Sequence, residues 1–135
     1  MSASRNEELV RLAIEAIWNR GELDVADTLF AADYVNHDGV IADIVLGPES
    51  IKVSAAFYRL AYPDLHVIVE ELTTDDEMVV LRWRASRGAD GTADTWSQKS
   101  MTGITRSRVA GGKIIESWTE WNRAVALHDL RLIND

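Results

Sequence analysis

The chain has 135 residues, 47% of them hydrophobic, and this size and composition predict one globular domain spanning residues 1–135. Its 22 acidic and 14 basic residues leave a formal net charge of -8, which argues against binding to nucleic acid or to an anionic membrane surface, because both are negatively charged. The chain has no cysteine, so disulfides, thiolate metal sites and a thiol nucleophile are excluded.

The first part of the chain is predicted to be helical. Ser4 and Glu7 form a capping-box pattern, after which apolar residues recur at helical spacing until Gly21. Pro48 suits the first position of a later helix, and Pro63 disfavours helix in the residue before it. The predicted helices begin at Ser4, at Asp24 as N-cap and at Pro48, and they end before Gly21, near Ala32 and at Tyr62.

From Asp64 onward the pattern is typical of strands, because runs of β-branched and aromatic residues are separated by turn residues. The predicted strands cover residues 65–72, 78–86, about 96–109 and 114–122, and residues 124–133 are expected to form a closing helix. Consecutive strands predict a four-stranded antiparallel meander. Because a sheet with one apolar face must be covered, we expect an α+β fold, a strongly curved sheet wrapped by the three N-terminal helices.

The last predicted strand carries the first candidate site. Side chains alternate along a strand, so one face of this one would combine two carboxylates, an amide and a tryptophan: Ile114, Glu116, Trp118, Glu120 and Asn122. The other interpretation of this face is an ordinary solvent-facing surface. Trp121 points the opposite way and is predicted to lie on the outer sheet face.

Six short motifs occur along the chain in the order typical of one family. They are Trp18-Asn19-Arg20-Gly21-Glu22, Asp33-Tyr34-Val35-Asn36-His37-Asp38, Gly47-Pro48-Glu49, Tyr62-Pro63-Asp64-Leu65, Val79-Val80-Leu81-Arg82-Trp83 and Gly112-Lys113-Ile114-Ile115-Glu116-Ser117-Trp118. In these motifs the chain resembles the SnoaL-like polyketide cyclases of the nuclear transport factor 2-like superfamily. The resemblance implies a cone of curved sheet and helices around an apolar pocket, usually in a homodimer formed through the sheet.

The resemblance also implies a catalytic position. Cyclases of this family have a tryptophan followed, four residues later, by an aspartate that serves as general acid and base in an intramolecular aldol ring closure. The matching residue here is Asn122, whose amide cannot exchange a proton at neutral pH. A histidine common on the second hairpin of cyclases is missing as well.

Two residues are candidates to replace the lost acid. Glu120 shares the predicted face of Asn122, and His37 belongs to a loop that lies by the pocket mouth in the family. Each has a structural alternative: Glu120 could form an ion pair with Arg82 or Arg84, and His37 could bond the backbone of Asp38 or Gly39.

The substrate pocket is expected to have aromatic walls and few polar groups. Trp83 and Trp118 are predicted to line it, together with Tyr34 and Asn36, which also resemble water-holding residues of limonene-type epoxide hydrolases. Both catalytic aspartates of those hydrolases are replaced, by Arg84 and Asn122. Arg82 and its neighbouring arginines could attract an acidic substrate or form a solvated, paired face. Large aromatic residues can also serve only as core.

Two functional hypotheses follow. The first is a cofactor-independent and metal-free enzyme of polyketide cyclase or isomerase type, acting on a small apolar or aromatic substrate. The second is a non-catalytic ligand-binding or accessory module with the same fold, and an epoxide hydrolase is a weaker third. Since the N-terminus has no apolar signal segment and no stretch approaches the roughly 20 apolar residues of a membrane span, a cytoplasmic protein without membrane partners is expected.

Overall fold

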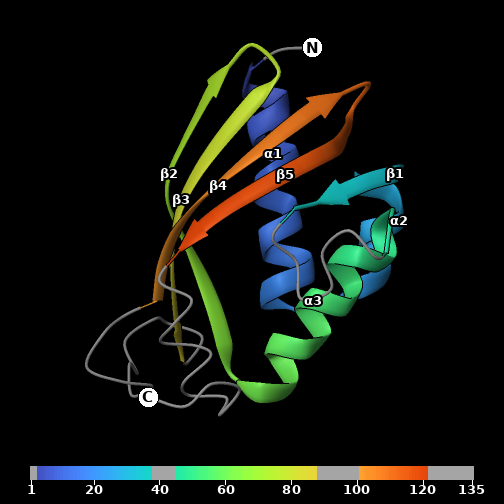
Figure 1. Ribbon diagram of the computed structural model, residues 1–135. Coiled ribbons are helices and arrows are strands. Elements are labelled where there is room, and N and C mark those ends of the chain that lie inside the picture. Colours follow the sequence, from blue (N-terminus) through green and yellow to red (C-terminus); the bar gives the residue numbers. More distant parts are fainter. Residues whose placement is uncertain (1–2, 38–44, 88–100, 122–135) are drawn as a thin grey trace.

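A curved five-stranded sheet forms one layer of the molecule, and helices cover one of its faces (Figure 1). The computed structural model describes residues 3–37, 45–87 and 101–121. The strands, in sheet order, are β1 (Phe30–Asn36), β5 (Lys113–Trp121), β4 (Met101–Ala110), β3 (Met78–Arg87) and β2 (Leu65–Asp75). Strands β2 to β5 form the predicted antiparallel meander, and the α+β class is confirmed.

Strand β1 was not expected from the sequence. Residues up to Ala32 were predicted to be helical, whereas the short helix α2 (Ala26–Leu29) ends earlier and β1 begins at once. β1 pairs in parallel with β5, with Asn36 opposite Ser117. Partners some 80 residues away supply its backbone hydrogen bonds, so the local sequence could not reveal the strand.

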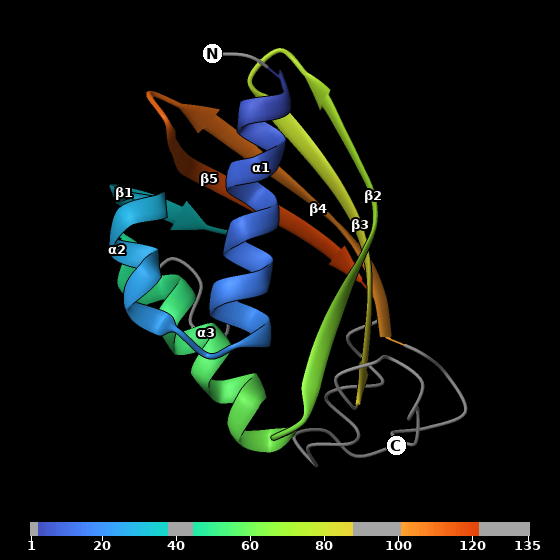
Figure 2. The same cartoon turned by 180° about the vertical axis from the view of Figure 1, so that it is seen from behind.

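The helical layer begins with α1 (Ala3–Ala13), which starts before Ser4, so this serine lies inside the first turn instead of capping it. A π-helical stretch, η1 (Ile14–Asn19), and a 3-10 turn, η2 (Leu23–Val25), follow, and α3 (Pro48–Ala61) starts at the predicted proline. α1 lies behind the sheet in Figure 1 and in front of it in Figure 2. The core between the two layers contains Ile17, Tyr34, Val79, Leu81 and Val109.

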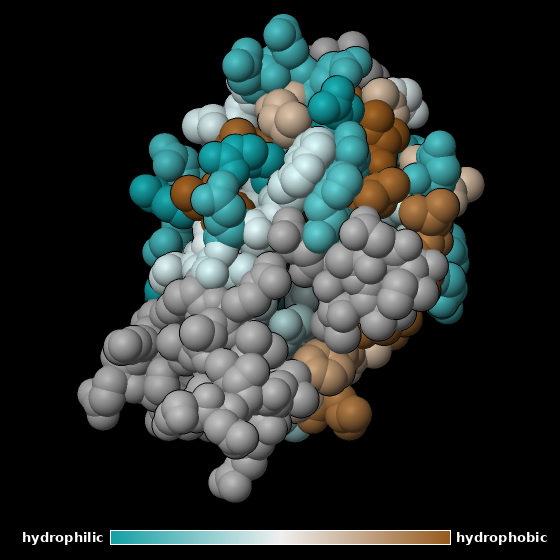
Figure 3. Space-filling model, in the orientation of Figure 1, coloured by the Kyte–Doolittle hydropathy of each residue, from teal (hydrophilic) through white to brown (hydrophobic). Residues whose placement is uncertain are grey.

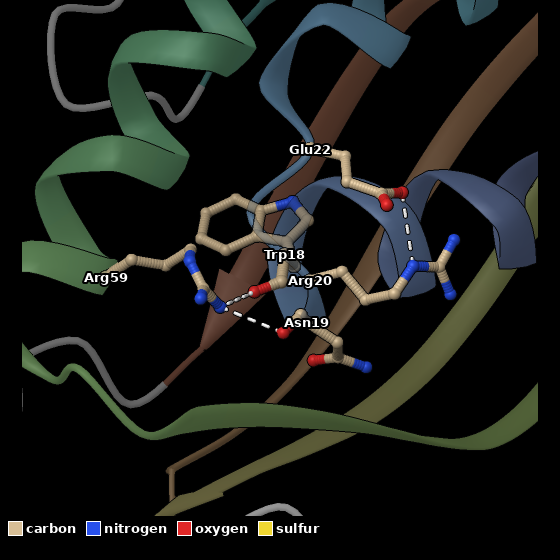
Figure 4. Close-up of polar contacts among 5 residues, drawn as sticks. All are labelled: Trp18, Asn19, Arg20, Glu22 and Arg59. Atoms are coloured by element: carbon tan, nitrogen blue, oxygen red, sulfur yellow. Dashed lines mark hydrogen bonds and ion pairs between the residues drawn. The ribbon is translucent and has the colours of Figure 1, made fainter.

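Polar contacts at the end of η1 join it to α3, as Figure 4 shows, and also to β2. The Arg59 guanidinium of α3 donates to the carbonyls of Trp18 and Asn19 at 2.7 and 3.0 Å, where a helix end leaves its carbonyls without helical partners. The Asn19 amide donates to the carbonyl of Val67 in β2 and accepts from its N–H, at 2.9 and 2.6 Å. Trp18 and Asn19, two residues of the first motif, therefore join η1 to α3. Asn19 also joins η1 to β2 of the sheet.

The β4–β5 hairpin turns at the predicted glycine pair. Gly111 and Gly112 have φ angles of 59° and 76°, the left-handed region that a two-residue hairpin turn requires. Just beyond the turn the register shifts, since Val109 pairs with Ile114 but Arg108 pairs with Glu116. β5 therefore contains one extra residue, a β-bulge, which reverses the faces on which later side chains lie.

The closing helix expected over residues 124–133, and the start of the strand expected near residue 96, lie outside the described residues. Within the described helices, none is long and apolar enough to cross a membrane.

Candidate functional site

An apolar cavity of about 150 Å3 lies between the helices and the concave face of the sheet. α1, η1 and α3 supply one wall, and all five strands supply the other. The residues that line it include Val10, Ala13, Trp18, Tyr34, Asn36, Ile51, Ser54, Tyr58, Trp83, Thr105, Ser117, Thr119 and Trp121. The polar groups among the described lining residues are hydroxyls, the Asn36 amide and the indole N–H groups of tryptophans, and these residues include no carboxylate, imidazole or cation.

The sheet side of the cavity is built in layers, because residues paired across antiparallel strands lie side by side. Ser107 of β4 pairs with Ser117 of β5. In the next layer, two residues further along each strand, Thr105 of β4 pairs with Thr119 of β5. In the layer after that, Gly103 of β4 pairs with Trp83 of β3 on one side and with Trp121 of β5 on the other. The wall therefore changes from hydroxyl to aromatic along the strands.

The hydroxyl end of the cavity, which we define as Tyr34, Asn36 and Ser117, joins β1 to β5. The Tyr34 hydroxyl and Ser117 Oγ lie 2.5 Å apart in a buried hydrogen bond, and the Tyr34 side chain is 1% exposed. Asn36 is 8% exposed and lies opposite Ser117 in the register. These groups can orient the oxygen of a bound molecule.

The aromatic end, which we define as Trp18, Tyr58, Trp83 and Trp121, consists of rings in mutual contact. The ring centroids of Trp83 and Trp121 are 5.9 Å apart, those of Tyr58 and Trp121 5.8 Å, and those of Trp18 and Tyr58 6.3 Å. Trp83 Nε1 donates to Thr105 Oγ1 at 3.0 Å, and Thr105 lies 2.9 Å from Thr119 Oγ1. The polar edge of Trp83 is thus engaged by protein, so its ring surface faces the cavity as an apolar wall.

Because of the β-bulge, the residues of β5 lie on other faces of the sheet than the sequence predicted. Glu116, Trp118 and Glu120 do share a face, but it is the outer one, whereas Ile114, before the bulge, points inward. Trp121, predicted to be outside, lines the cavity instead. The predictions that Trp118 lines the pocket and that Glu120 lies at it are therefore wrong.

Charged residues on the outer face form ion pairs across neighbouring strands. Glu120, 80% exposed, pairs with Arg106 at 3.0 Å, not with either arginine proposed from the sequence. Arg82, predicted to bind the substrate, lies 3.4 Å from Glu71 on this face and does not line the cavity. Figure 3 shows mostly hydrophilic and near-neutral side chains over these strands.

His37 belongs to a cluster on the same outer face. Its Nε2 lies 2.8 Å from Glu116, and its ring stacks on Trp118 with centroids 4.9 Å apart. The Arg108 guanidinium lies 5.8 Å from the centre of the Trp118 ring on β5. His37, the turn residue that follows β1, therefore does not line the cavity, although Asn36, the last residue of the strand, does.

Sequence reasoning placed Tyr34, Asn36 and Trp83 at the cavity, and the structure puts them there. It missed Ser117, Thr119 and Trp121. The charges of Glu116 and Glu120 could have indicated that the opposite face of β5 lines the cavity, because in a half-buried strand the face that carries charges normally meets water. Asn122, the match to the catalytic aspartate of the family, lies outside the described residues.

No group of three potential metal ligands occurs among the residues that the structure describes. The cavity walls named above offer hydroxyl and amide oxygens, which bind a divalent ion weakly without carboxylates.

A curved sheet covered by helices on one face, with an apolar cavity between them, is the arrangement of the nuclear transport factor 2-like superfamily. The sequence profile of the SnoaL-like polyketide cyclase family matches residues 8–130. The chain therefore belongs to the SnoaL-like polyketide cyclase family, as its motifs predicted. No curated protein sequence matches the chain significantly.

Solved structures have the same fold. IdmH, a candidate polyketide cyclase from Streptomyces antibioticus, is 25% identical, with a TM-score of 0.73 over 93% of this chain and 98% of its own. A candidate polyketide cyclase from Acidithiobacillus ferrooxidans is 22% identical, with a TM-score of 0.76 over 99% and 100% of the two chains. AclR, a candidate hydroxylase from Streptomyces galilaeus, is 23% identical, with a TM-score of 0.72 over 99% and 85%. The fold is thus shared by proteins assigned to different reactions.

Proposed function

We propose that this protein is a small-molecule enzyme of polyketide cyclase or isomerase type that works without a cofactor. The observation that carries the proposal is the buried Tyr34–Ser117 hydroxyl pair at one end of an otherwise apolar cavity, in a chain of the SnoaL-like family. Hydroxyl groups held in place stabilise the oxygen of an enolate or an alkoxide most where water is excluded.

The reaction that fits this site is an intramolecular ring closure or enolisation. Water takes a proton from the carbon beside one carbonyl, the resulting enolate carbon bonds to a second carbonyl carbon as its C=O π bond opens, and the alkoxide oxygen formed there takes a proton back from water. Within the Tyr34–Ser117 pair one hydroxyl donates to the other, and the second hydroxyl can donate to the oxygen on which charge develops, with Asn36 beside them. Tyrosine can also serve as the proton donor, since its hydroxyl takes part in general acid–base catalysis in other enzymes.

The test uses heptane-2,6-dione, a small diketone that closes to a cyclohexenone with loss of water. We expect the protein to accelerate this closure, and Tyr34→Phe to lower the rate about 100-fold, the usual loss when one oxyanion donor is removed. Tyr62→Phe is the matched control, because Tyr62 is buried but does not line the cavity. Equal rates for the parent and Tyr34→Phe would contradict the assignment of Tyr34.

The competing function is a ligand-binding module without catalysis. It is favoured by one observation, that no carboxylate or imidazole lines the cavity among the described residues. Under this alternative the diketone and its cyclic product bind but are not interconverted. Multiple turnovers per protein molecule would exclude it.

A further inference from the structure

We infer that the cavity selects an uncharged molecule with one ring, or of one-ring size, bound with its oxygen at the hydroxyl end and its hydrocarbon part at the aromatic end. The inference rests on the proposed function and specifies its substrate class. Three features carry it: the volume of the cavity, the separation of its polar and aromatic walls, and the charge of its lining.

The volume sets the size of the ligand. Drug-sized ligands occupy pockets of roughly 300–1,000 Å3, whereas an apolar cavity of about 150 Å3 is known to hold benzene. The cavity here measures about 150 Å3. A fused polycyclic molecule exceeds this volume, and it would have to protrude from the cavity or displace packed side chains such as Ile51 and Leu81, which are 7% and 1% exposed.

The positions of the hydroxyl and tryptophan residues along the strands determine the orientation of the bound molecule. From Ser117 to Trp121 the strand advances four residues, about 13 Å between Cα atoms, so the two layers lie at different ends of the cavity. The hydroxyl layer and the tryptophan layer therefore contact opposite ends of a ligand. A ring placed at Ser117 would leave the tryptophans without apolar contact and bury the hydroxyls against carbon, which costs free energy.

Gly103 shapes the aromatic end. A Cβ atom at Gly103 would lie 2.5 Å from Cζ2 of Trp83 and 2.8 Å from Cβ of Trp121. The missing side chain lets the Trp83 ring lie against β4 beside Trp121. The resulting wall is broad and apolar, which suits the face or edge of a flat ring.

The charge of the lining excludes ionised ligands. Charged groups of β4 and β5, such as Arg108 and Glu116, lie on the outer sheet face. A carboxylate in the cavity would lose its hydration without gaining a cationic partner among the described lining residues, and such burial is unfavourable. Neutral oxygens, as in ketones, phenols and enols, suit the hydroxyl end.

Calorimetric titration with four probes tests the inference on the purified protein: phenol, toluene, benzoate and the three-ring phenol 2-anthrol. We expect phenol and toluene to bind with one site per chain, and benzoate to bind at least about tenfold more weakly than phenol. Benzoate or 2-anthrol binding as tightly as phenol would overturn the inference.

Variants of the two ends test the orientation. Tyr34→Phe is expected to weaken phenol binding about 3- to 10-fold, the loss of one hydrogen bond, and to leave toluene within about twofold. Trp83→Leu is expected to weaken both ligands, and Trp83→Phe, which keeps a ring, to restore most of the loss. An equal effect of Tyr34→Phe on phenol and toluene, or no effect of Trp83→Leu on either, would refute the orientation.

Binding and turnover separate the two proposals. If phenol and toluene bind as expected and heptane-2,6-dione is not closed, the inference stands and the proposed function fails. If the diketone is closed but benzoate binds as well as phenol, the proposed function stands and the inference fails.

Discussion

Gly103 and Gly111 illustrate how one residue type serves two purposes in this chain. Gly111 takes a φ of 59° in the hairpin turn, and a Cβ there would meet nothing within 4 Å. Gly103 leaves space for the ring of Trp83. The first glycine is required by backbone conformation and the second by packing.

Gly103→Ala tests the packing role. The added methyl would overlap the Trp83 ring and lower the free energy of unfolding by about 1–3 kcal/mol, the usual cost of overpacking. Urea unfolding measures this loss, and calorimetry with toluene measures the accompanying loss of binding. Gly111→Ala is the matched control: it is expected to cost about 1–2 kcal/mol through its φ angle alone and to keep toluene binding. Unchanged toluene affinity in Gly103→Ala would contradict the role given to this glycine.

At the scale of elements, the contacts between η1, α3 and β2 hold the helical layer against the sheet. The Asn19 amide makes two hydrogen bonds to the backbone of Val67, in place of a neighbouring strand. Trp18, the residue before it, lines the cavity. The wall of the site therefore depends on this junction.

Asn19→Ala tests the junction. It leaves the N–H and the carbonyl of Val67 without these partners and is expected to lower the free energy of unfolding by about 2 kcal/mol. Arg20→Ala is the control, since Arg20 forms only a half-exposed ion pair with Glu22, and such pairs contribute about 0–1 kcal/mol. Equal destabilisation by the two substitutions in urea would show that the junction contributes nothing specific.

The β-bulge in β5 acts on a whole element as well. Because it inserts one residue, the charged and tryptophan side chains at Glu116, Trp118 and Glu120 face outward and Ser117, Thr119 and Trp121 face the cavity. In a strand without the bulge, Glu116 and Glu120 would point to the same face as Ile114, and their carboxylates would lie in the cavity. One residue thus decides which chemistry the cavity contains.

For the whole molecule, the family resemblance predicts a homodimer through the outer sheet face. Trp121 no longer supports this, because it lines the cavity. The cluster of His37, Glu116, Arg108 and Trp118 is the part of this face that offers a large ring to a second copy. We propose that this cluster lies at the dimer interface.

Sedimentation of the purified protein tests the dimer. We expect the parent to sediment as a dimer and Trp118→Glu, which adds a charge at the cluster, to sediment as a monomer. Since Trp118 points away from the cavity, the variant is expected to keep its phenol affinity. Thr102→Ser, also on an exposed position of the sheet, is the control and is expected to remain dimeric. A monomeric parent would rule the proposal out.

Much of the fold was predictable because its signals are local. Pro48 starts α3, the pair Gly111 and Gly112 turns the last hairpin, and β-branched runs mark the meander. The ordered motifs indicated the family, which the profile match confirmed. These features depend on backbone conformation and on neighbours within a few residues, so the chain itself carries the information.

The site was decided by tertiary structure. Strand β1 exists through its parallel pairing with β5, and Ser117 and Trp121 reach the cavity through a bulge whose presence depends on the register with β4. A strand sequence specifies two faces, but the side on which the helices pack selects the buried one. By itself the sequence therefore determined the family, the meander and the inward Tyr34, Asn36 and Trp83, whereas long-range pairing determined which residues of β5 meet the ligand.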